Sequence, residues 1–347
     1  MSRLEGVYTA LITPTVGRGE VDWDSYDRLL DFQASSGVRG VVVGGTTGES
    51  PTLETEELCR LVVRAHDRLP SAVEVIPGTG RNHLRGTLEL TRFAADLGLS
   101  TVMLVDPYYN APSSAEIRRE YIGPVADRFP GLGILPYVIP GRTGTRLDPR
   151  DVAGLLAEGR RIAGVKDATG EDAYAGELRR RCPTLPILSG DDARTLTMMA
   201  DPAIRADGVI SVVANIAPHA VVDFVRSANA SDWPAARRKA ADLQALFDIV
   251  TIRVVERADA DGEVTIRSRN PVPVKSAMAL LGAPVGACRP PLGRLSPMGL
   301  EVLHSALATT HRRAPGTLRP LGDQFGADIS ERLSDRALWP ELSYGQL

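Results

Sequence analysis

The feature that most constrains the fold is a regular alternation of short apolar runs with amphipathic stretches. Eight runs rich in Val, Ile and Leu are typical of strands, at 6–14, 38–45, 73–80, 101–107, 133–140, 162–169, 185–191 and 207–215. The stretches between them, such as 56–69 and 88–97, repeat apolar residues at helical spacing. Eight such units over about 220 residues match an α/β fold of the (β/α)8 TIM-barrel type better than an open sheet.

The pattern changes after residue 215, where we expect the strands to stop. Segments 220–230, 235–255 and 273–282 have helical periodicity, and the charged, Gly-containing segment 256–270 reads as an exposed insertion. We therefore predict a catalytic barrel over residues 1–230 and a helical C-terminal subdomain over 231–311. Residues 312–347, which have few apolar residues in any period, are predicted to form a tail or arm.

The composition is that of a soluble globular protein that works in the cytoplasm. The chain has 347 residues, a net charge of −3 and no basic block, so we expect neither nucleic acid nor a membrane as partner. No apolar segment is long enough for a signal peptide or a membrane span. The three cysteines and five histidines are scattered without metal-ligand spacing, so no metal site is expected.

Lysine usage singles out one residue of the apolar runs. Only three of the 40 basic residues are lysines, namely Lys166, Lys239 and Lys275, and Lys166 stands within the run IAGVKDATG. A buried lysine can lose its proton and attack a ketone to form a Schiff base, which arginine cannot do. The alternative is a structural lysine in a buried ion pair with Asp167 or another acid.

Polar motifs follow several of the predicted strands, at the end of the barrel where active sites lie. GGTTGES (44–50) offers backbone N–H groups to an anion and the hydroxyls of Thr46 and Thr47 for proton transfer, or it is a plain Gly-rich turn. DPYYNAP (106–112) carries tyrosines that are either catalytic or part of a subunit contact.

Two further strand ends carry candidate residues. In LPYVIPGRTG (135–144), Tyr137 ends the strand and Arg142 follows in a Pro-Gly turn that suits capture of a carboxylate, although an arginine can also simply cover the barrel rim. In SGDD (189–192), the paired carboxylates favour a helix cap over metal or acid–base chemistry.

Taken in this order, the motifs GTTGES, GTG, PYYN, PGRTG, GVKDATG, SGDD, GVISVVAN and NPVPVK resemble those of one enzyme family. This is the 4-hydroxy-tetrahydrodipicolinate synthase (dihydrodipicolinate synthase) family, in the N-acetylneuraminate lyase superfamily of pyruvate-dependent class I aldolases. The resemblance covers residues 6–291 and implies a (β/α)8 barrel with a helical C-terminal domain. It also implies a homo-oligomer, a tetramer or a dimer, and no cofactor.

The resemblance implies a role for each matched residue. Lys166 corresponds to the Schiff-base lysine, and Tyr137, Thr47 and Tyr109 to the proton relay, the last reaching in from a neighbouring subunit. The other matches concern substrate binding: the backbone amides of Thr46 and Thr47 for the pyruvate carboxylate, Arg142 for the second carboxylate, and Gly190 and Ile210 for the wall of the pyruvate pocket.

The function implied is a lyase that condenses pyruvate with the small aldehyde L-aspartate 4-semialdehyde, in lysine and diaminopimelate biosynthesis. One alternative keeps the Schiff base but acts on a 2-keto-3-deoxy sugar acid or related 2-oxo acid. Val138, where the family usually has Asn, favours this alternative, and the intact PGRTG motif opposes it. Another alternative, a catalytically silent binding barrel, predicts loss of the lysine or the tyrosine, and both are present.

Overall fold

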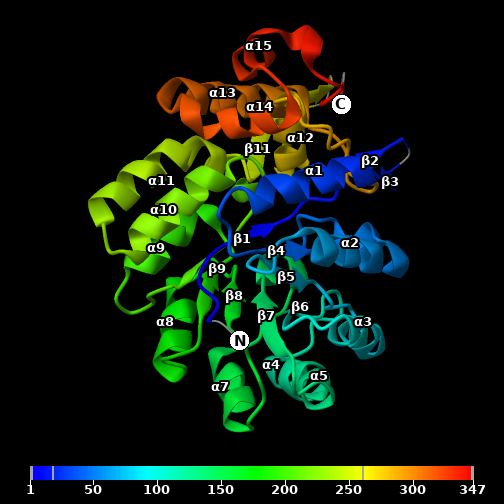
Figure 1. Ribbon diagram of the computed structural model, residues 1–347, viewed down its shortest axis with the longest axis vertical. Coiled ribbons are helices and arrows are strands. Elements are labelled where there is room, and N and C mark those ends of the chain that lie inside the picture. Colours follow the sequence, from blue (N-terminus) through cyan, green and yellow to red (C-terminus); the bar gives the residue numbers. More distant parts are fainter. Residues whose placement is uncertain (1–2, 18, 260–261, 345–347) are drawn as a thin grey trace.

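The computed structural model of the protein describes residues 3–17, 19–259 and 262–344. Parallel strands run through the centre of its lower part, and helices surround them (Figure 1). The eight strands are β1 (Gly6–Ala10), β4 (Gly40–Val43), β5 (Glu74–Pro77), β6 (Thr101–Val105), β7 (Gly133–Val138), β8 (Val165–Asp167), β9 (Ile187–Ser189) and β10 (Gly208–Ser211). Each lies within one of the eight predicted runs, which confirms the strand prediction.

The strands curl into a nearly closed barrel. They pair in the order β5-β4-β1-β10-β9-β8-β7-β6, and all of these pairings are parallel. At the two ends of the sheet, Gly78 bridges Met103, and the N–H of Thr79 donates to the Met103 carbonyl over 3.1 Å. The predicted (β/α)8 architecture is therefore confirmed.

Successive side chains of the strands point alternately into and out of the barrel. On β7, Leu135 and Tyr137 belong to the cluster that fills the barrel, whereas Ile134 and Val138 belong to the outer core beneath the helices. This two-sided burial explains why the strands read as continuous apolar runs. It also means that a polar residue on an inward position lies inside the barrel.

Helices cover the outside of the barrel and bury one apolar face each. On α2 (Thr55–Arg68), for example, Leu58, Leu61, Val62 and Ala65 are buried. The other helices of this layer are α1 (Trp23–Ala34), α3 (Leu84–Asp96), α4 (Ser114–Glu116), η2 (Ile117–Ile122), α5 (Gly123–Arg128), α7 (Pro149–Ala157), α8 (Asp172–Arg181), α9 (Thr195–Ala200) and α10 (Pro218–Asn229). A small antiparallel pair, β2 (Thr15–Val16) and β3 (Glu20–Val21), precedes α1.

Helices also dominate the C-terminal region, which stacks on one side of the barrel above α1 (Figure 1). They are α11 (Trp233–Asp248), α12 (Val272–Leu280), α13 (Pro297–Arg313), α14 (Arg319–Phe325) and α15 (Ile329–Ser334). The segment after residue 312 is thus largely helical, with Leu318, Leu321 and Ile329 buried. The division of the chain at residues 230 and 311 stays a prediction. None of the helices in the described residues is long and apolar enough to cross a membrane.

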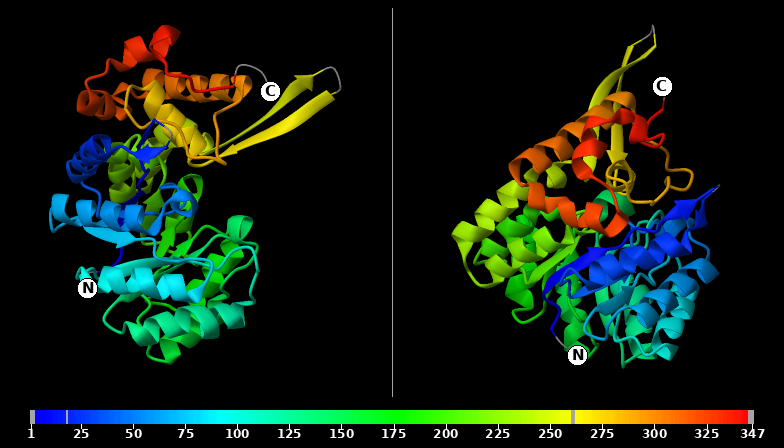
Figure 2. Two further views of the ribbon diagram at one scale, coloured as in Figure 1. Left: turned by 90° about the vertical axis from the view of Figure 1, so that its right-hand side faces the viewer. Right: turned by 45° about the horizontal axis from the view of Figure 1, so that its top comes forward.

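Two related predictions for this region are wrong, because strands do occur after residue 215. The stretch 235–255 was expected to be one helix, but α11 ends at Asp248 and strand β11 (Thr251–Asp259) follows, paired with β12 (Gly262–Arg269) in an antiparallel hairpin. The β-branched run of Thr251, Ile252, Val254 and Val255 favours a strand over a helix. The hairpin projects from the body of the molecule (Figure 2).

Candidate active site

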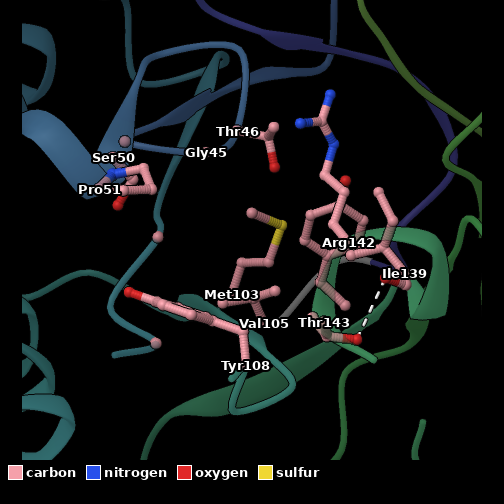
Figure 3. A pocket seen from close by; sticks show the side chains of 14 residues that line it. Gly45, Thr46, Ser50, Pro51, Met103, Val105, Tyr108, Ile139, Arg142 and Thr143 are labelled. Carbon is pink, nitrogen blue, oxygen red and sulfur yellow. Dashed lines mark hydrogen bonds between the residues drawn. The ribbon is translucent and has the colours of Figure 1, made fainter. Parts of the chain in front are cut away.

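A cavity of about 250 Å³ opens at the carboxyl ends of the barrel strands. Its walls come from the loops that follow β4, β5, β6 and β7, with Thr46 and Arg142 near each other on one side and Ser50 and Pro51 opposite (Figure 3). Tyr137 also lines it. In barrel enzymes this end of the strands carries the chemistry, so the cavity is the candidate active site.

Lys166 lies beside Tyr137, which lines this cavity, but Lys166 is not itself one of the lining residues. Lys166 and Tyr137 are register partners on the neighbouring strands β8 and β7, and both are only 4% exposed. The Lys166 Nζ lies 3.9 Å from the centroid of the Tyr137 ring. The structure therefore places the predicted amine and the predicted proton carrier side by side.

The charge state of Lys166 is set by its burial. Removal from water lowers the pKa of this amine, although the neighbouring Tyr137 and Asp192 act in the opposite direction. No carboxylate among the described residues forms an ion pair with Lys166. Asp167, the partner weighed from the sequence, instead accepts a hydrogen bond from the Thr169 N–H over 2.8 Å. The environment of Lys166 suits a nucleophilic amine better than a structural cation.

The GTTGES loop presents two threonines to the site. Thr46 lines the cavity, and the Thr47 side chain is 2% exposed. Neither of their backbone N–H groups donates a hydrogen bond to any of the described residues, so both remain available to an anion. Gly44 permits the turn, because its φ is +68° and a Cβ there would lie 2.3 Å from Leu58.

A buried ion pair supports this loop from behind. The Lys275 Nζ donates to the Glu49 carboxylate over 2.8 Å, and the two side chains are 2% and 1% exposed. The same ammonium donates to the carbonyl oxygens of Thr13 and Ala287. Lys275, one of the three lysines noted in the sequence, thus has the structural role of a buried ion-pair partner. Sequence reasoning did not identify its acid partner, which lies 226 positions away.

Arg142 is held at the mouth of the cavity by a short helix, α6 (Pro140–Thr143). The Thr143 hydroxyl donates to the Ile139 carbonyl over 3.1 Å, which fixes the turn (Figure 3). The Arg142 guanidinium donates to the Asn270 carbonyl over 2.8 Å, and no carboxylate among the described residues pairs with it. Its remaining donors are available to a ligand that carries a carboxylate.

Asn270 is a residue of the site that sequence reasoning missed. Its side-chain amide donates to the Thr47 hydroxyl over 2.9 Å, while its carbonyl oxygen accepts from Arg142. One residue therefore connects the loop after β4 with the loop after β7. The signal in the sequence was the NPVPVK motif, which was used for the resemblance but not as a source of site residues.

Gly190 and Ile210 do not line the cavity: Gly190 directly follows β9 and donates its N–H to the Asp167 carbonyl over 2.7 Å, and Ile210 lies on β10. Ile210 belongs to the inner cluster, and a Cβ on Gly190 would lie 2.8 Å from the Ala168 Cβ, so only glycine fits there. The SGDD motif makes caps and cross-strand bonds: Asp191 accepts from the Ala193 N–H, and Asp192 accepts from Ser211 and from the Val212 N–H. The preference for a helix cap is confirmed for Asp191.

Tyr109 does not line the cavity and, unlike the buried Lys166, Tyr137 and Thr47, lies on the surface. Its side chain is 90% exposed, and its φ of +76° is unusual for a residue other than glycine. Its neighbour Tyr108 lines the cavity instead (Figure 3). Within one chain, the hydroxyl of Tyr109 therefore lies outside the constellation of Lys166, Tyr137 and Thr47.

Together these groups can carry out carbonyl chemistry through a covalent amine adduct. Lys166 supplies a nucleophile of lowered pKa, and the hydroxyls of Tyr137 and Thr47 can move protons. The free amides of the GTTGES loop and the guanidinium of Arg142 offer two separate places for anionic groups. The arrangement fits the addition of one small oxo acid to a second, carboxylate-bearing molecule.

Known proteins share this architecture and much of this sequence. The family model described as "Dihydrodipicolinate synthetase family" matches residues 3–310. A protein of Methanococcus maripaludis named 4-hydroxy-tetrahydrodipicolinate synthase is 35% identical over 305 residues, which cover 88% of this chain and 98% of that protein.

Solved structures give the same result. The 4-hydroxy-tetrahydrodipicolinate synthase of Methylacidiphilum fumariolicum SolV superposes with a TM-score of 0.81 at 33% identity, covering 92% of this chain and 99% of that one. A protein described as the first monomeric dihydrodipicolinate synthase variant gives a TM-score of 0.78 at 32% identity, with coverages of 88% and 96%. The chain therefore belongs to the dihydrodipicolinate synthetase family.

Proposed function

We propose that this enzyme condenses pyruvate with L-aspartate 4-semialdehyde through a Schiff base on Lys166, forming 4-hydroxy-tetrahydrodipicolinate for lysine and diaminopimelate biosynthesis. The observation that carries the proposal is the pairing of the buried amine of Lys166 with the Tyr137 ring, 3.9 Å apart, beside a cavity that Tyr137 and Arg142 line. The names of the relatives that match nearly the whole chain support the same reaction.

Pyruvate is the first substrate in this proposal. Its carboxylate accepts hydrogen bonds from the backbone amides of Thr46 and Thr47, which directs its ketone carbon toward Lys166. The neutral amine adds to that carbon, and the resulting carbinolamine loses water to give a protonated imine. Tyr137 and Thr47 carry the protons that leave the nitrogen and reach the departing oxygen. Gly190 and Ile210 leave room for the small methyl group.

The imine then serves as an electron sink. Loss of a proton from the methyl carbon gives an enamine, and this carbon attacks the aldehyde carbon of the second substrate. Arg142 binds the carboxylate of that substrate at the cavity mouth. The substrate's own amine next attacks the imine carbon, which closes the ring and releases Lys166 as a free amine. Tyr137 and Thr47 carry the proton lost by the methyl carbon to the aldehyde oxygen, which becomes the hydroxyl group of the product.

Oligomerisation is part of the proposal because of Tyr109. A tyrosine that is 90% exposed in one chain can complete the proton relay of a neighbouring copy, as the resemblance implies. The family as a whole does not fix the number of subunits, since one member is described as a monomeric variant. We propose a homo-oligomer in which Tyr109 enters the partner's site.

The sugar-acid alternative depended on Val138. This residue is 0% exposed and lies in the outer core, on the face of β7 turned away from the cavity. Its identity therefore does not change the groups that face a ligand. Arg142, in contrast, faces the cavity and suits a carboxylate-bearing aldehyde.

The test is a coupled assay of the purified protein with pyruvate and L-aspartate 4-semialdehyde, beside a panel of 2-keto-3-deoxy acids. The proposal expects clear turnover of the semialdehyde and little turnover of the panel. Arg142→Ala should raise KM for the semialdehyde about 10- to 150-fold, the value of a charge-assisted bond of ~1.5–3 kcal/mol. Imine formation with pyruvate should survive. A preference for a keto-deoxy acid, or an unchanged KM, would contradict the proposal.

A further inference from the structure

The hairpin of β11 and β12 begins and ends beside the active site. Asn270, the residue directly after β12, bonds both Thr47 and Arg142. The last residue of β12, Arg269, donates from both terminal nitrogens to the Gly141 carbonyl over 3.3 Å, next to Arg142. The base of the hairpin thus forms part of the rim of the cavity.

The two faces of the hairpin differ in chemistry. One face is packed on the C-terminal helices: Ile252 and Val254 are 3% and 8% exposed, and Glu256 accepts from the Met298 N–H at the start of α13. The register places Arg253 opposite Arg267 and Thr251 opposite Arg269 on the other face. Three guanidinium groups therefore share the face that is turned away from α13.

The positive charges of these arginines are not offset by ion pairs among the described residues, although Glu263 lies on the same face of the hairpin. Among the side chains that the structure describes, no carboxylate pairs with Arg253, Arg267 or Arg269, whereas most arginines elsewhere on the surface do form such pairs. Like charges directly opposite each other on a hairpin are unfavourable. The arrangement lowers the stability of the hairpin. Binding of an anionic ligand on this face would offset that loss.

The charge of the hairpin extends to the active-site arginine. The pKa of Arg142 is lowered, first because the surrounding protein displaces water from part of its guanidinium. Tyr137 acts against this shift, whereas Arg269 and Arg267 add to it by repulsion. The pKa of Arg269 is likewise lowered by loss of water and by Arg267. An anion bound among Arg142, Arg267 and Arg269 would offset the repulsion between these guanidinium groups. The mouth of the cavity therefore carries several positive charges around Arg142 that no ion pair of the described residues offsets.

We propose that Arg267 and Arg269 are specificity-determining residues that attract and position the carboxylate of the second substrate at Arg142. The ligand class is a small aldehyde or ketone that bears at least one carboxylate. The hairpin acts before the chemistry, by raising the local concentration of the anion and directing its carboxylate to the guanidinium. This inference rests on the proposed function for the identity of the aldehyde, but not for the anionic character of the ligand.

The experiment compares the wild type with Arg267→Gln, Arg269→Gln and the double variant over a range of ionic strength. At low salt the double variant should lose about 10-fold in kcat/KM for L-aspartate 4-semialdehyde, with less than about a twofold change in kcat. The difference should shrink to below about twofold at 0.5 M salt, where the Debye length falls to a few ångströms. Compared with Arg269→Gln, the variant Arg269→Lys should recover most of the wild-type salt dependence, since it keeps the positive charge. A purely structural role for the Gly141 contact predicts no such rescue and no salt dependence.

The matched control is Arg238→Gln, which removes one exposed charge from α11 without approaching the cavity. It should leave both kcat/KM and its salt dependence as in the wild type. Equal losses in this control and in Arg269→Gln would overturn the inference, since the net charge of the protein would then explain the effect.

Calorimetric titration separates this inference from the proposed function. Succinate added to the pyruvate-loaded wild type should bind, and the double variant should bind it about 10-fold more weakly at low salt. This measurement needs no turnover, so it remains decisive even if L-aspartate 4-semialdehyde is not the substrate. Equal succinate affinity in the two proteins would overturn the role of the hairpin, whatever the enzyme condenses.

Discussion

Lys166 and Tyr137 face each other across two neighbouring strands, with the lysine Nζ 3.9 Å from the centre of the tyrosine ring. Both side chains point into a barrel filled by apolar residues such as Leu135 and Leu188. An amine in such surroundings loses hydration, which lowers its pKa, and the ring beside it limits the positions that Nζ can take. The pair thus couples a reactive amine to a hydroxyl-bearing ring.

Tyr137→Phe tests the role of the hydroxyl alone. The ring and its contact with Lys166 remain, so the fold should be intact while kcat falls by the ~10²–10⁴ of a lost proton carrier. The control is Tyr8→Phe, a tyrosine that is also inside the barrel but bonds Glu74 through its hydroxyl. Steady-state kinetics with circular dichroism would measure both. A fall of less than about threefold for Tyr137→Phe would show that another group moves the protons.

Asn270→Ala separates its two contacts. The substitution removes the bond to the Thr47 hydroxyl but keeps the backbone carbonyl that binds Arg142. We expect kcat to fall about 2- to 12-fold, the value of one hydrogen bond, with KM for the aldehyde nearly unchanged. The exposed Asn229 at the end of α10 provides a control substitution that should change neither value. A rise in the aldehyde KM with constant kcat would contradict this assignment.

Lys275→Met should be the most destabilising of the lysine substitutions. It leaves the Glu49 carboxylate buried without its ammonium partner, which costs about 3–5 kcal/mol of unfolding free energy. Lys239→Met, which removes only hydrogen bonds to Asp223 and Ser227, should cost less than about 1.5 kcal/mol. Urea denaturation measures both. Adding Glu49→Gln to Lys275→Met should recover part of the loss, and a fully additive double variant would contradict the coupling.

Asp106 should make stability depend on pH. Burial raises the pKa of its carboxyl to about 8, and one of its oxygens has no hydrogen-bond partner among the described residues. Between the ordinary value of 3.8 and this one, the folded protein holds a proton that the unfolded chain has released. The stability therefore falls as pH rises through this window, by up to about 1.4 kcal/mol per pH unit.

Asp106→Asn removes this titration but keeps an oxygen to accept from the Leu147 N–H. The variant should resemble the wild type in stability near pH 4 and exceed it increasingly toward pH 8. Urea unfolding at several pH values, taken as the difference between the two proteins, isolates the effect of this one group. A difference that does not vary with pH would contradict it.

The barrel could be predicted from the sequence because each of its strands and helices leaves a pattern in its own short stretch of residues. Each strand is buried on both faces and therefore reads as a continuous apolar run, and the intervening helices repeat their apolar residues at 3.6-residue spacing. Lys166, Tyr137, Thr47 and Arg142 stand at or just after such strands, so the geometry of the barrel brings them to one end. The tertiary structure added the distances between these residues and a further member, Asn270, which bonds Thr47 and Arg142.

The missed features depend on contacts between distant parts of the chain. Asn270 reaches Thr47 across 223 positions and Lys275 reaches Glu49 across 226, and no local pattern records such pairs. The hairpin was missed for another reason. The helical spacing of apolar residues in α11 continues into Ile252 and Val255, so this spacing could not show where the helix ends. The β-branched residues there were the available signal.

Tyr109 differs from these residues because its expected contacts lie in another subunit. The family resemblance implies a place in the proton relay for Tyr109, yet in the isolated chain Tyr109 is exposed and Tyr108 lines the cavity. A residue whose partner lies on another copy leaves no contact within its own chain. Its role stays a prediction that depends on the oligomer.

Borohydride trapping shows whether Lys166 is the amine that binds pyruvate. The protein is treated with borohydride in the presence of pyruvate, digested, and analysed by peptide mass spectrometry, with Lys239 and Lys275 of the same sample as internal comparisons. If Lys166 forms the imine, a reduced pyruvate adduct should be found on Lys166 alone, and activity should fall in proportion to labelling. An adduct on either other lysine, or an active enzyme that yields no adduct at all, would contradict it.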